Sequence, residues 1–227
     1  MKIIIFGASG MLGQGVVREC LLAADVSGVA VVTRQALAIS NPKLQQIVTP
    51  DPTKFSLSRE DIRQYDACFF CLGVSATGMT EEKYRQLTYE LTMNVASQLQ
   101  QANPAMAFIY VSGAGTDSSE QGKVMWARVK GKTENALLKL GFAHAWMFRP
   151  AIIQPLNGAR SKTASYRIFY QLLTPLFPLL KYLFPTAILT TEDMGKAMLN
   201  AVRYGYDKPI LEKGDISQLA KAGGEQN

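Results

Sequence analysis

The sequence predicts an α/β fold in which a doubly wound parallel sheet is covered by helices on both faces. Short apolar runs rich in Val, Ile, Phe and Ala alternate with longer stretches whose apolar residues recur at helical spacing. The short runs are apolar throughout, which is typical of parallel strands buried on both faces. With 227 residues, 48% of them hydrophobic, the chain is long enough for one core, and its length favours one domain over two.

Six runs are predicted to be strands because each is short, apolar and bounded by glycine, proline or polar residues. They cover residues 2–6, 29–33, 44–48, 67–72, 107–111 and 143–148. Helical spacing predicts helices over residues 10–23, 80–101 and 122–140, with Gly141 ending the last one. The segment 41–58 contains three prolines and no helical pattern, so the crossover there is predicted to be short or irregular.

The pattern changes after Pro150. Residues 168–191 carry one charged side chain, Lys181, and three prolines, so a helical excursion over a pocket or a partner is favoured over a membrane span. Thr190 and Asp193 have the spacing of a capped helix start, which predicts a helix over residues 194–204. We therefore expect a single domain over residues 1–227, in which residues from about 158 to 227 form a small C-terminal cap.

Composition limits the functional classes. The net charge is +6, and residues 121–181 hold ten basic side chains against one acidic side chain. An anionic ligand and a solvated basic face explain this excess equally well, and no nucleic-acid-binding motif accompanies it. Three cysteines and a single histidine, His144, exclude a complete disulfide framework and any metal site that needs two imidazoles. Cys68 and Cys71 have a Cys-x-x-Cys spacing, but positions three apart on a strand face opposite sides, so we interpret them as buried thiols.

Two features predict a cytoplasmic location. The cysteine usage fits a reducing compartment. The apolar run at the N-terminus has only four residues before Gly7, which is far shorter than the apolar part of a signal peptide, so export is not expected.

The strongest functional signal is a glycine motif, GASGMLG at residues 7–13, directly after the first strand and at the start of the first helix. Gly7 permits a tight turn, Gly10 lets backbone amides approach a pyrophosphate, and Gly13 allows the helix to pack closely on the sheet. The helix N-terminus then faces the phosphates. The motif predicts a dinucleotide site, with a purely structural turn as the alternative. Its predicted members are Gly7, Ser9, Gly10, Met11, Leu12 and Gly13.

The end of the second strand indicates which dinucleotide binds. An acid there would hold a ribose 2′-hydroxyl, whereas this strand ends in Thr33 and Arg34, and a guanidinium suits a 2′-phosphate. NADP(H) is therefore favoured over NAD(H). Leu72 and Gly73 follow the fourth strand, where a glycine lets the backbone lie against the nicotinamide ribose.

Five segments, in this order, resemble the atypical and extended short-chain dehydrogenase/reductase superfamily: GASGMLG at 7–13, CLG at 71–73, YVSGAG at 110–115, KGKTE at 130–134 and FRPAII at 148–153. The chain is similar to the NAD(P)-binding Rossmann branch that includes the TIP30-like oxidoreductases. The resemblance implies a Rossmann-like fold, a Tyr-x-x-x-Lys pair that handles a proton during hydride transfer, and a Ser or Thr after the fifth strand. Ser112 and Lys130 match two of these positions, and Trp126 occupies the position of the tyrosine.

An indole N–H cannot act as an acid or base near neutrality, so three interpretations stay open. In the first, another group donates the proton, with Tyr84, Tyr89 and Tyr166 as the first tyrosines to consider. In the second, the proton comes from water, and Ser112 and Lys130 hold the cofactor. In the third, the protein binds NADPH without turnover, as a sensor or scaffold.

The resulting hypothesis is NADPH-dependent reduction of a small carbonyl compound or related electrophile, with the non-catalytic binder as the alternative. We expect a small substrate that is anionic or carries a carbonyl group, no nucleic-acid partner, no transmembrane span, and a monomer or homodimer. Arg149, at the end of the sixth strand, either binds an anionic group of the substrate or belongs to a structural salt bridge. Ser112 has a structural alternative too, in which it ends its strand and bonds the backbone.

Overall fold

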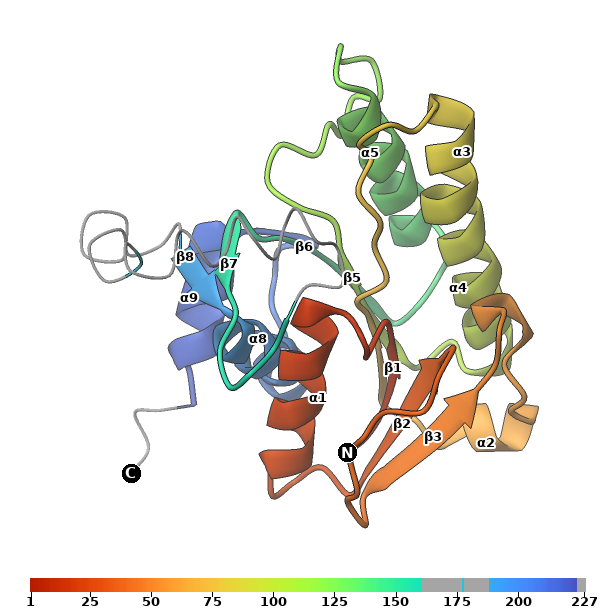
Figure 1. Cartoon of the computed structure of the whole chain (residues 1–227), viewed down its shortest axis with the longest axis vertical. Helices are drawn as coiled ribbons and strands as arrows, with labels where there is room; N and C mark the ends of the chain where they lie inside the picture. The colour runs from red at the N-terminus through yellow and green to blue at the C-terminus, as the bar shows by residue number, and fades with distance from the viewer. Residues whose placement is uncertain (161–176, 178–187, 224–227) are drawn as a thin grey trace.

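A computed structural model of the chain describes residues 1–160, 177 and 188–223 (Figure 1). Within them, seven strands form one parallel sheet in the order β3-β2-β1-β4-β5-β6-β9. The strands are β1 (Lys2–Phe6), β2 (Gly28–Thr33), β3 (Leu44–Val48), β4 (Ala67–Phe70), β5 (Ala107–Val111), β6 (His144–Arg149) and β9 (Ile210–Glu212). Beside this sheet, β7 (Ile152–Gln154) pairs in parallel with β8 (Ile188–Thr190). The prediction of a doubly wound parallel α/β sheet is confirmed.

Helices cover both faces of the sheet (Figure 1). One face carries α1 (Met11–Leu22), α8 (Thr191–Tyr204) and α9 (Lys213–Lys221), and the other carries α3 (Glu81–Arg85), α4 (Leu91–Ala102) and α5 (Met125–Leu138). Successive strand residues enter different cores because side chains alternate along a strand. Ile3 and Ile5 of β1 pack with α1 and α8, whereas Ile4 and Phe6 pack with α4.

The structure differs from the sequence prediction in several elements, and it contains β7, β8 and α9 (Lys213–Lys221), where the sequence predicted no strand or helix. The helix expected over residues 80–101 is interrupted by a π-helical turn, η2 (Gln86–Glu90), which joins α3 to α4. The segment expected to be irregular contains a short 3-10 turn, η1 (Pro52–Lys54), and is followed by α2 (Arg59–Arg63), which begins with a reciprocal cap between Ser58 and Asp61. The seventh strand, β9, was missed because three residues are too few to register as an apolar run.

The boundaries of the expected cap need correction. Residues 191–223 belong to the main sheet and its helical layer, since β9 pairs with β6 and α8 packs against α1. A Cβ on Gly15 of α1 would lie 2.5 Å from the Thr191 Cβ of α8, so the two helices approach to backbone contact. The other part of the expected cap, residues 161–176 and 178–187, including the apolar segment, lies outside the described residues. No helix in the described part of the chain is long and apolar enough to cross a membrane.

We expect Gly13→Ala to destabilise the fold strongly. A Cβ on Gly13 would lie 2.1 Å from the carbonyl oxygen of Gly7, and backbone atoms on both sides of that contact have little freedom to move. The loss in unfolding free energy should exceed about 3 kcal/mol, at the upper end of overpacking effects. Thermal unfolding would measure it. Gly214→Ala in α9, where a Cβ meets nothing within 4 Å, is the matched control and should not lower the midpoint. Equal midpoints for both variants would contradict the expectation.

Candidate functional site

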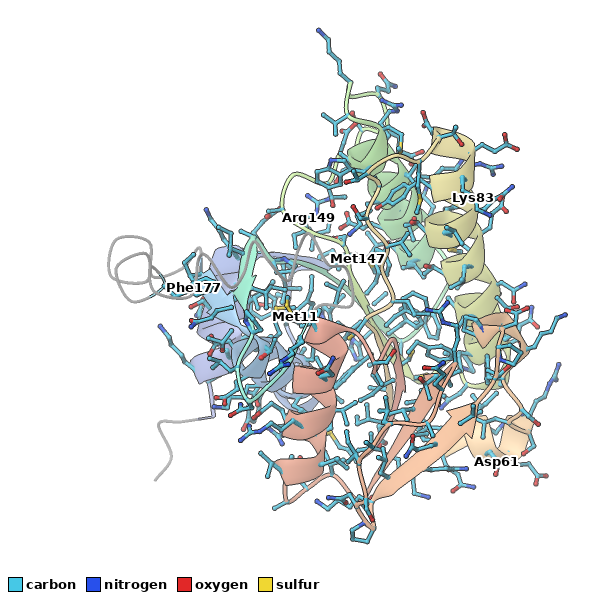
Figure 2. All side chains as sticks on the ribbon, viewed as in Figure 1. Met11, Asp61, Lys83, Met147, Arg149 and Phe177 are labelled. Carbon is cyan, nitrogen blue, oxygen red and sulfur yellow. The ribbon has the colours of Figure 1, made fainter. Side chains whose placement is uncertain are left out.

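The glycine motif forms a tight turn at the edge where the strands of the sheet end. Gly7 has φ 86°, and a Cβ on it would lie 2.6 Å from the backbone carbon of Cys71, just after β4. The amide of Gly10 donates to the carbonyl oxygen of Gly7 at 3.0 Å, and α1 starts at the next residue, Met11 (Figure 2). The turn therefore holds the start of α1 against the exit of β4.

The N-terminus of α1 is suited to an anion. Its N-cap, Gly10, has no side chain to bond the first amides of the helix, and no acidic residue lies in the first turn. The first amides of a helix lack intrahelical partners and carry the positive end of the helix dipole. The arrangement can therefore bind a phosphate group through backbone N–H groups.

Two residues predicted to bind the cofactor lie at the end of β2, and one of them is buried while the other is exposed. Thr33 is buried, and its hydroxyl donates to the carbonyl oxygen of Gln35 at 2.9 Å. Arg34 is exposed and makes no hydrogen bond or ion pair with the described residues. Arg34 therefore leaves its guanidinium available to a ligand.

The exit of β4 is open at Gly73. A Cβ on Gly73 would meet nothing within 4 Å, so neither contacts nor a left-handed backbone require a glycine there. Its predecessor Leu72 packs against the core beside α4. Burial raises the pKa of the Cys68 and Cys71 thiols, which keeps them protonated, and among the described residues no cluster could hold a metal ion.

A buried ion pair lies beside this edge, between α5, β5 and β6. Arg149 pairs with Glu134, which is fully buried, and reaches Glu212 at 3.2 Å and Ser118 at 2.6 Å. The Ser112 hydroxyl donates to Glu134 at 2.5 Å and approaches the carbonyl oxygen of Phe148 at 3.2 Å. For Arg149 the structural interpretation is therefore the correct one, and the Ser112 hydroxyl is likewise engaged inside the protein.

Lys130 lies one helical turn before Glu134 on α5. Its ammonium group donates to the backbone carbonyl oxygen of Ser112. Burial lowers the pKa of Lys130 to about 8, and the nearby Glu134 carboxylate opposes that shift in part. Since an ammonium group has three donors, a lysine in this position retains hydrogens for a ligand.

A pocket of about 500 Å³ adjoins Lys130. Trp126 and Tyr84 both line it, together with the loop that follows the exit of β4. Of the other tyrosines considered above, Tyr89 lies under the ammonium group of Lys132, 5.1 Å from it, and Tyr166 lies outside the described residues. The site therefore combines a lysine, an indole and a phenol around one cavity.

Glu134 is the site residue that sequence reasoning missed. It is the one acidic residue among residues 121–181, and it follows Lys130 by one helical turn. Both signals were visible in the sequence, because residues four apart share a helix face. Its pairing with Arg149 was not visible, since that contact requires β5, β6 and α5 to be assembled.

Comparison with known proteins gives weak sequence matches. No protein-family model matches the chain. It is 26% identical over 152 residues to the curated protein fmp52-2, mitochondrial, of Aspergillus terreus, covering 66% of each chain. It is 25% identical over 161 residues to FMP52, mitochondrial, of Candida albicans, covering 67% of each. The chain thus spans about two thirds of the length of these relatives. The prediction of a cytoplasmic location was wrong by this comparison, because the relatives are named as mitochondrial proteins.

Solved structures match over most of the chain. A short-chain dehydrogenase/reductase from Saccharomyces cerevisiae has a TM-score of 0.65 at 13% identity and covers 97% of this chain and 98% of its own. The Bordetella bronchiseptica enzyme WbmH, in complex with NAD⁺, has a TM-score of 0.63 at 15% identity, over 93% of this chain and 74% of its own. The chain therefore has the Rossmann-like fold of short-chain dehydrogenase/reductase proteins.

We expect Glu134→Gln to reduce stability without unfolding the chain at neutral pH. The substitution removes the buried countercharge of Arg149, which leaves the guanidinium only the more distant Glu212. Breaking a buried pair in this way costs about 3 kcal/mol. Urea unfolding would measure the loss. The control is Glu90→Gln, which removes the charge from an ion pair with Arg85 whose two side chains are both exposed to solvent. It should change stability by less than about 0.5 kcal/mol. A Glu134→Gln effect as small as the control would contradict this expectation.

Proposed function

We propose that this chain binds NADP(H) and acts as an oxidoreductase of the atypical short-chain dehydrogenase/reductase type, similar to the TIP30-like oxidoreductases, as a single unit over residues 1–227. The observation that supports it most directly is the uncapped N-terminus of α1, held at the strand ends by the turn at Gly7. Such a helix start binds a pyrophosphate in dinucleotide-binding folds.

Different residues around this turn bind different parts of the cofactor. Backbone amides of the motif hold the pyrophosphate, Arg34 with Thr33 holds the 2′-phosphate, and Leu72 with Gly73 lies along the nicotinamide ribose. The open space at Gly73 supports the last assignment, since a glycine that the chain itself does not require leaves room for a ligand. The Lys130 ammonium group donates to the ribose hydroxyls with the hydrogens that it does not donate to the Ser112 carbonyl oxygen. The proposed cofactor-binding residues are Gly7, Ser9, Gly10, Met11, Leu12, Gly13, Thr33, Arg34, Leu72, Gly73 and Lys130.

The proposed reaction is the reduction of a small carbonyl compound or related electrophile. When bound, the reduced nicotinamide supplies a hydride to such a substrate. Lys130 orients the ribose and keeps a positive charge near the developing alkoxide. Ser112 contributes by carrying the backbone carbonyl that Lys130 bonds, since its own hydroxyl is donated to Glu134.

A second candidate function is binding of NADP(H) without turnover. The observation in its favour is Trp126, which lines the pocket at the position where the family carries its tyrosine. A spectrophotometric screen of NADPH oxidation over a broad carbonyl panel, with Trp126→Tyr as the comparison, separates the two candidates. Turnover by the natural chain supports the reductase. Cofactor binding without turnover by either chain supports the sensor or scaffold.

Calorimetric titration tests the cofactor assignment. We expect the chain to bind NADPH more tightly than NADH, and Arg34→Ala to weaken NADPH binding by about 10- to 100-fold, the value of a lost hydrogen bond between charged groups. NADH affinity should stay unchanged, because NADH lacks the 2′-phosphate. Arg59→Ala, at the start of α2, is the control and should bind NADPH as the natural chain does. Absence of heat with both nucleotides contradicts the proposal.

Cofactor affinity should depend on pH through Lys130. Its pKa is lowered to about 8, so the ammonium is charged below that value and becomes neutral as the pH rises above it. We therefore expect NADPH to bind about tenfold more weakly above this pH than below it, the value of one charged hydrogen bond. Calorimetry from pH 6.5 to 9.5 measures the change. Lys130→Met should flatten the profile, and Lys132→Met should preserve it. A flat profile for the natural chain excludes a role for the Lys130 charge.

A further inference from the structure

Lys130 is the only charged side chain among the described residues that line the pocket beside α5. We propose that the Lys130 amine is a covalent binding site for small aldehydes with an apolar body, with which it forms an imine in this pocket. Imine formation requires no nucleotide, so this inference goes beyond the function proposed above. It gives Lys130 a second chemistry that excludes its contact with the nicotinamide ribose.

Lys130 has no carboxylate partner among the described residues. Glu134, the only acidic side chain of α5, uses both of its oxygens elsewhere. Its Oε1 accepts from Ser112 at 2.5 Å and from Arg149 at 3.0 Å, and its Oε2 accepts from Arg149. In the described part of the chain, Lys130 donates only to the carbonyl oxygen of Ser112. One neutral acceptor compensates poorly for the water that a charged ammonium group loses, which favours the neutral amine.

The charges around Lys130 leave a large fraction of the amine neutral. Among the described lining residues, Tyr84 of α3 is the only other titratable group, and the loop after β4 contributes no charge. Arg149, at the end of β6, balances the nearby Glu134. Burial lowers the pKa of Lys130 to about 8, and Glu134 opposes part of this shift. At pH 7.5 about a quarter of Lys130 is therefore neutral, against about one in a thousand for an ordinary lysine.

The space next to the Lys130 nitrogen can accept a ligand atom. A Cβ on Gly113, in the loop after β5, would lie 3.9 Å from Nζ and 4.0 Å from the carbonyl oxygen of Pro150. Apart from its own chain neighbours, no described residue would lie closer to that Cβ. The hydrogen bond to Ser112 uses one hydrogen of the neutral amine and leaves its lone pair unshared. An electrophilic carbon can therefore reach the nitrogen from this side.

The walls of the pocket indicate which aldehydes it binds. Val74 and Ala76 line it from the loop after β4. Met125 and Trp126 line it from the first turn of α5. Burying an apolar molecule against such side chains is favourable, whereas a sugar aldehyde would lose hydrogen bonds to water without replacement. Aldehydes with a hydrocarbon or aromatic body match this cavity of about 500 Å³.

The proposed reaction balances without an oxidant or a reductant. The lone pair of Lys130 forms a C–N bond to the aldehyde carbon as the C=O π bond breaks, and the π electron pair goes to oxygen. One amine proton moves to that oxygen, which gives a carbinolamine. The C–O bond then breaks, the oxygen leaves as water with the second amine proton, and the C=N bond forms. The products are an imine and water.

The first experiment compares two lysines of one helix within the natural chain. Limiting benzaldehyde and sodium cyanoborohydride at pH 7.5 convert imines into stable benzylamines, which fragment-ion mass spectrometry locates. Lys130 should be labelled at least about tenfold faster than Lys132, since its neutral fraction outweighs the lower nucleophilicity of a weaker base. Lys132 is exposed, so access alone favours Lys132. Equal labelling of the two lysines, or faster labelling of Lys132, would overturn the proposal.

A second experiment tests whether the pocket itself binds the aldehyde. Ala76→Trp places a large side chain on the pocket wall, so it should slow the labelling of Lys130 severalfold and leave Lys132 unchanged. Ala222→Trp, at an exposed position after α9, is the control and should label as the natural chain does. Thermal unfolding verifies that both variants are folded. Unchanged labelling of Lys130 in folded Ala76→Trp contradicts binding in this pocket.

A third measurement separates this inference from the proposed function. The imine and the ribose contact use the same nitrogen, so saturating NADP⁺, which supplies no hydride, should slow the labelling of Lys130 and not that of Lys132. Fast labelling that bound NADP⁺ does not slow supports the aldehyde site and contradicts the role of Lys130 in the cofactor site. Fast labelling in a chain that binds no nucleotide contradicts the proposed function alone. Slow labelling in a chain that binds NADPH overturns the aldehyde site alone.

Discussion

The close backbone approach between the turn at Gly7 and the exit of β4 determines the geometry of the whole strand-end edge. A Cβ on Gly7 would overlap the backbone of Cys71, and a Cβ on Gly13 would overlap Gly7 itself, so the turn, α1 and β4 are fixed against each other without side chains between them. Rigid backbone contact aims the first amides of α1 at one point in space. Because β1 and β4 are central strands, that point lies in the middle of the sheet edge, where ligands bind in open α/β folds.

The buried pair of Glu134 and Arg149 fixes the neighbouring part of the same edge. A buried ion pair adds little net stability, because the attraction mainly offsets the cost of removing both charges from water. Its effect here is geometric. The Glu134 carboxylate of α5 bonds the Ser112 hydroxyl directly after β5 and the Arg149 guanidinium at the end of β6, so the helix has one position relative to both strands. Lys130, one turn earlier on α5, is thereby held at the carbonyl of Ser112.

Local sequence patterns sufficed for the fold and for the glycine turn. The central strands and α1 follow from periodicity and from glycine spacing, which act over a few residues. Periodicity did not predict β9 or the π-helical turn, since three residues cannot display a period and the five residues of the turn do not visibly interrupt the helical spacing around them. It also left the partner of Ser112 undecided. The hydroxyl meets Glu134 only after β5 and α5 pack together, so no spacing along the chain encodes that hydrogen bond.

The difference between local sequence patterns and contacts formed only in the folded chain also applies to the proton donor. A Tyr-x-x-x-Lys pattern describes two residues on one helix face, so the presence of Trp126 reads in the sequence as the loss of the donor. Chemistry requires only that a phenol and an ammonium group reach the same cavity, whichever elements carry them. In this fold α3 and α5 lie side by side on one face of the sheet, held there by Glu81 and Arg128, and both border the pocket. In this arrangement Tyr84 of α3 lines the same pocket as Trp126 and Lys130 of α5, so the side chains around one cavity come from two helices.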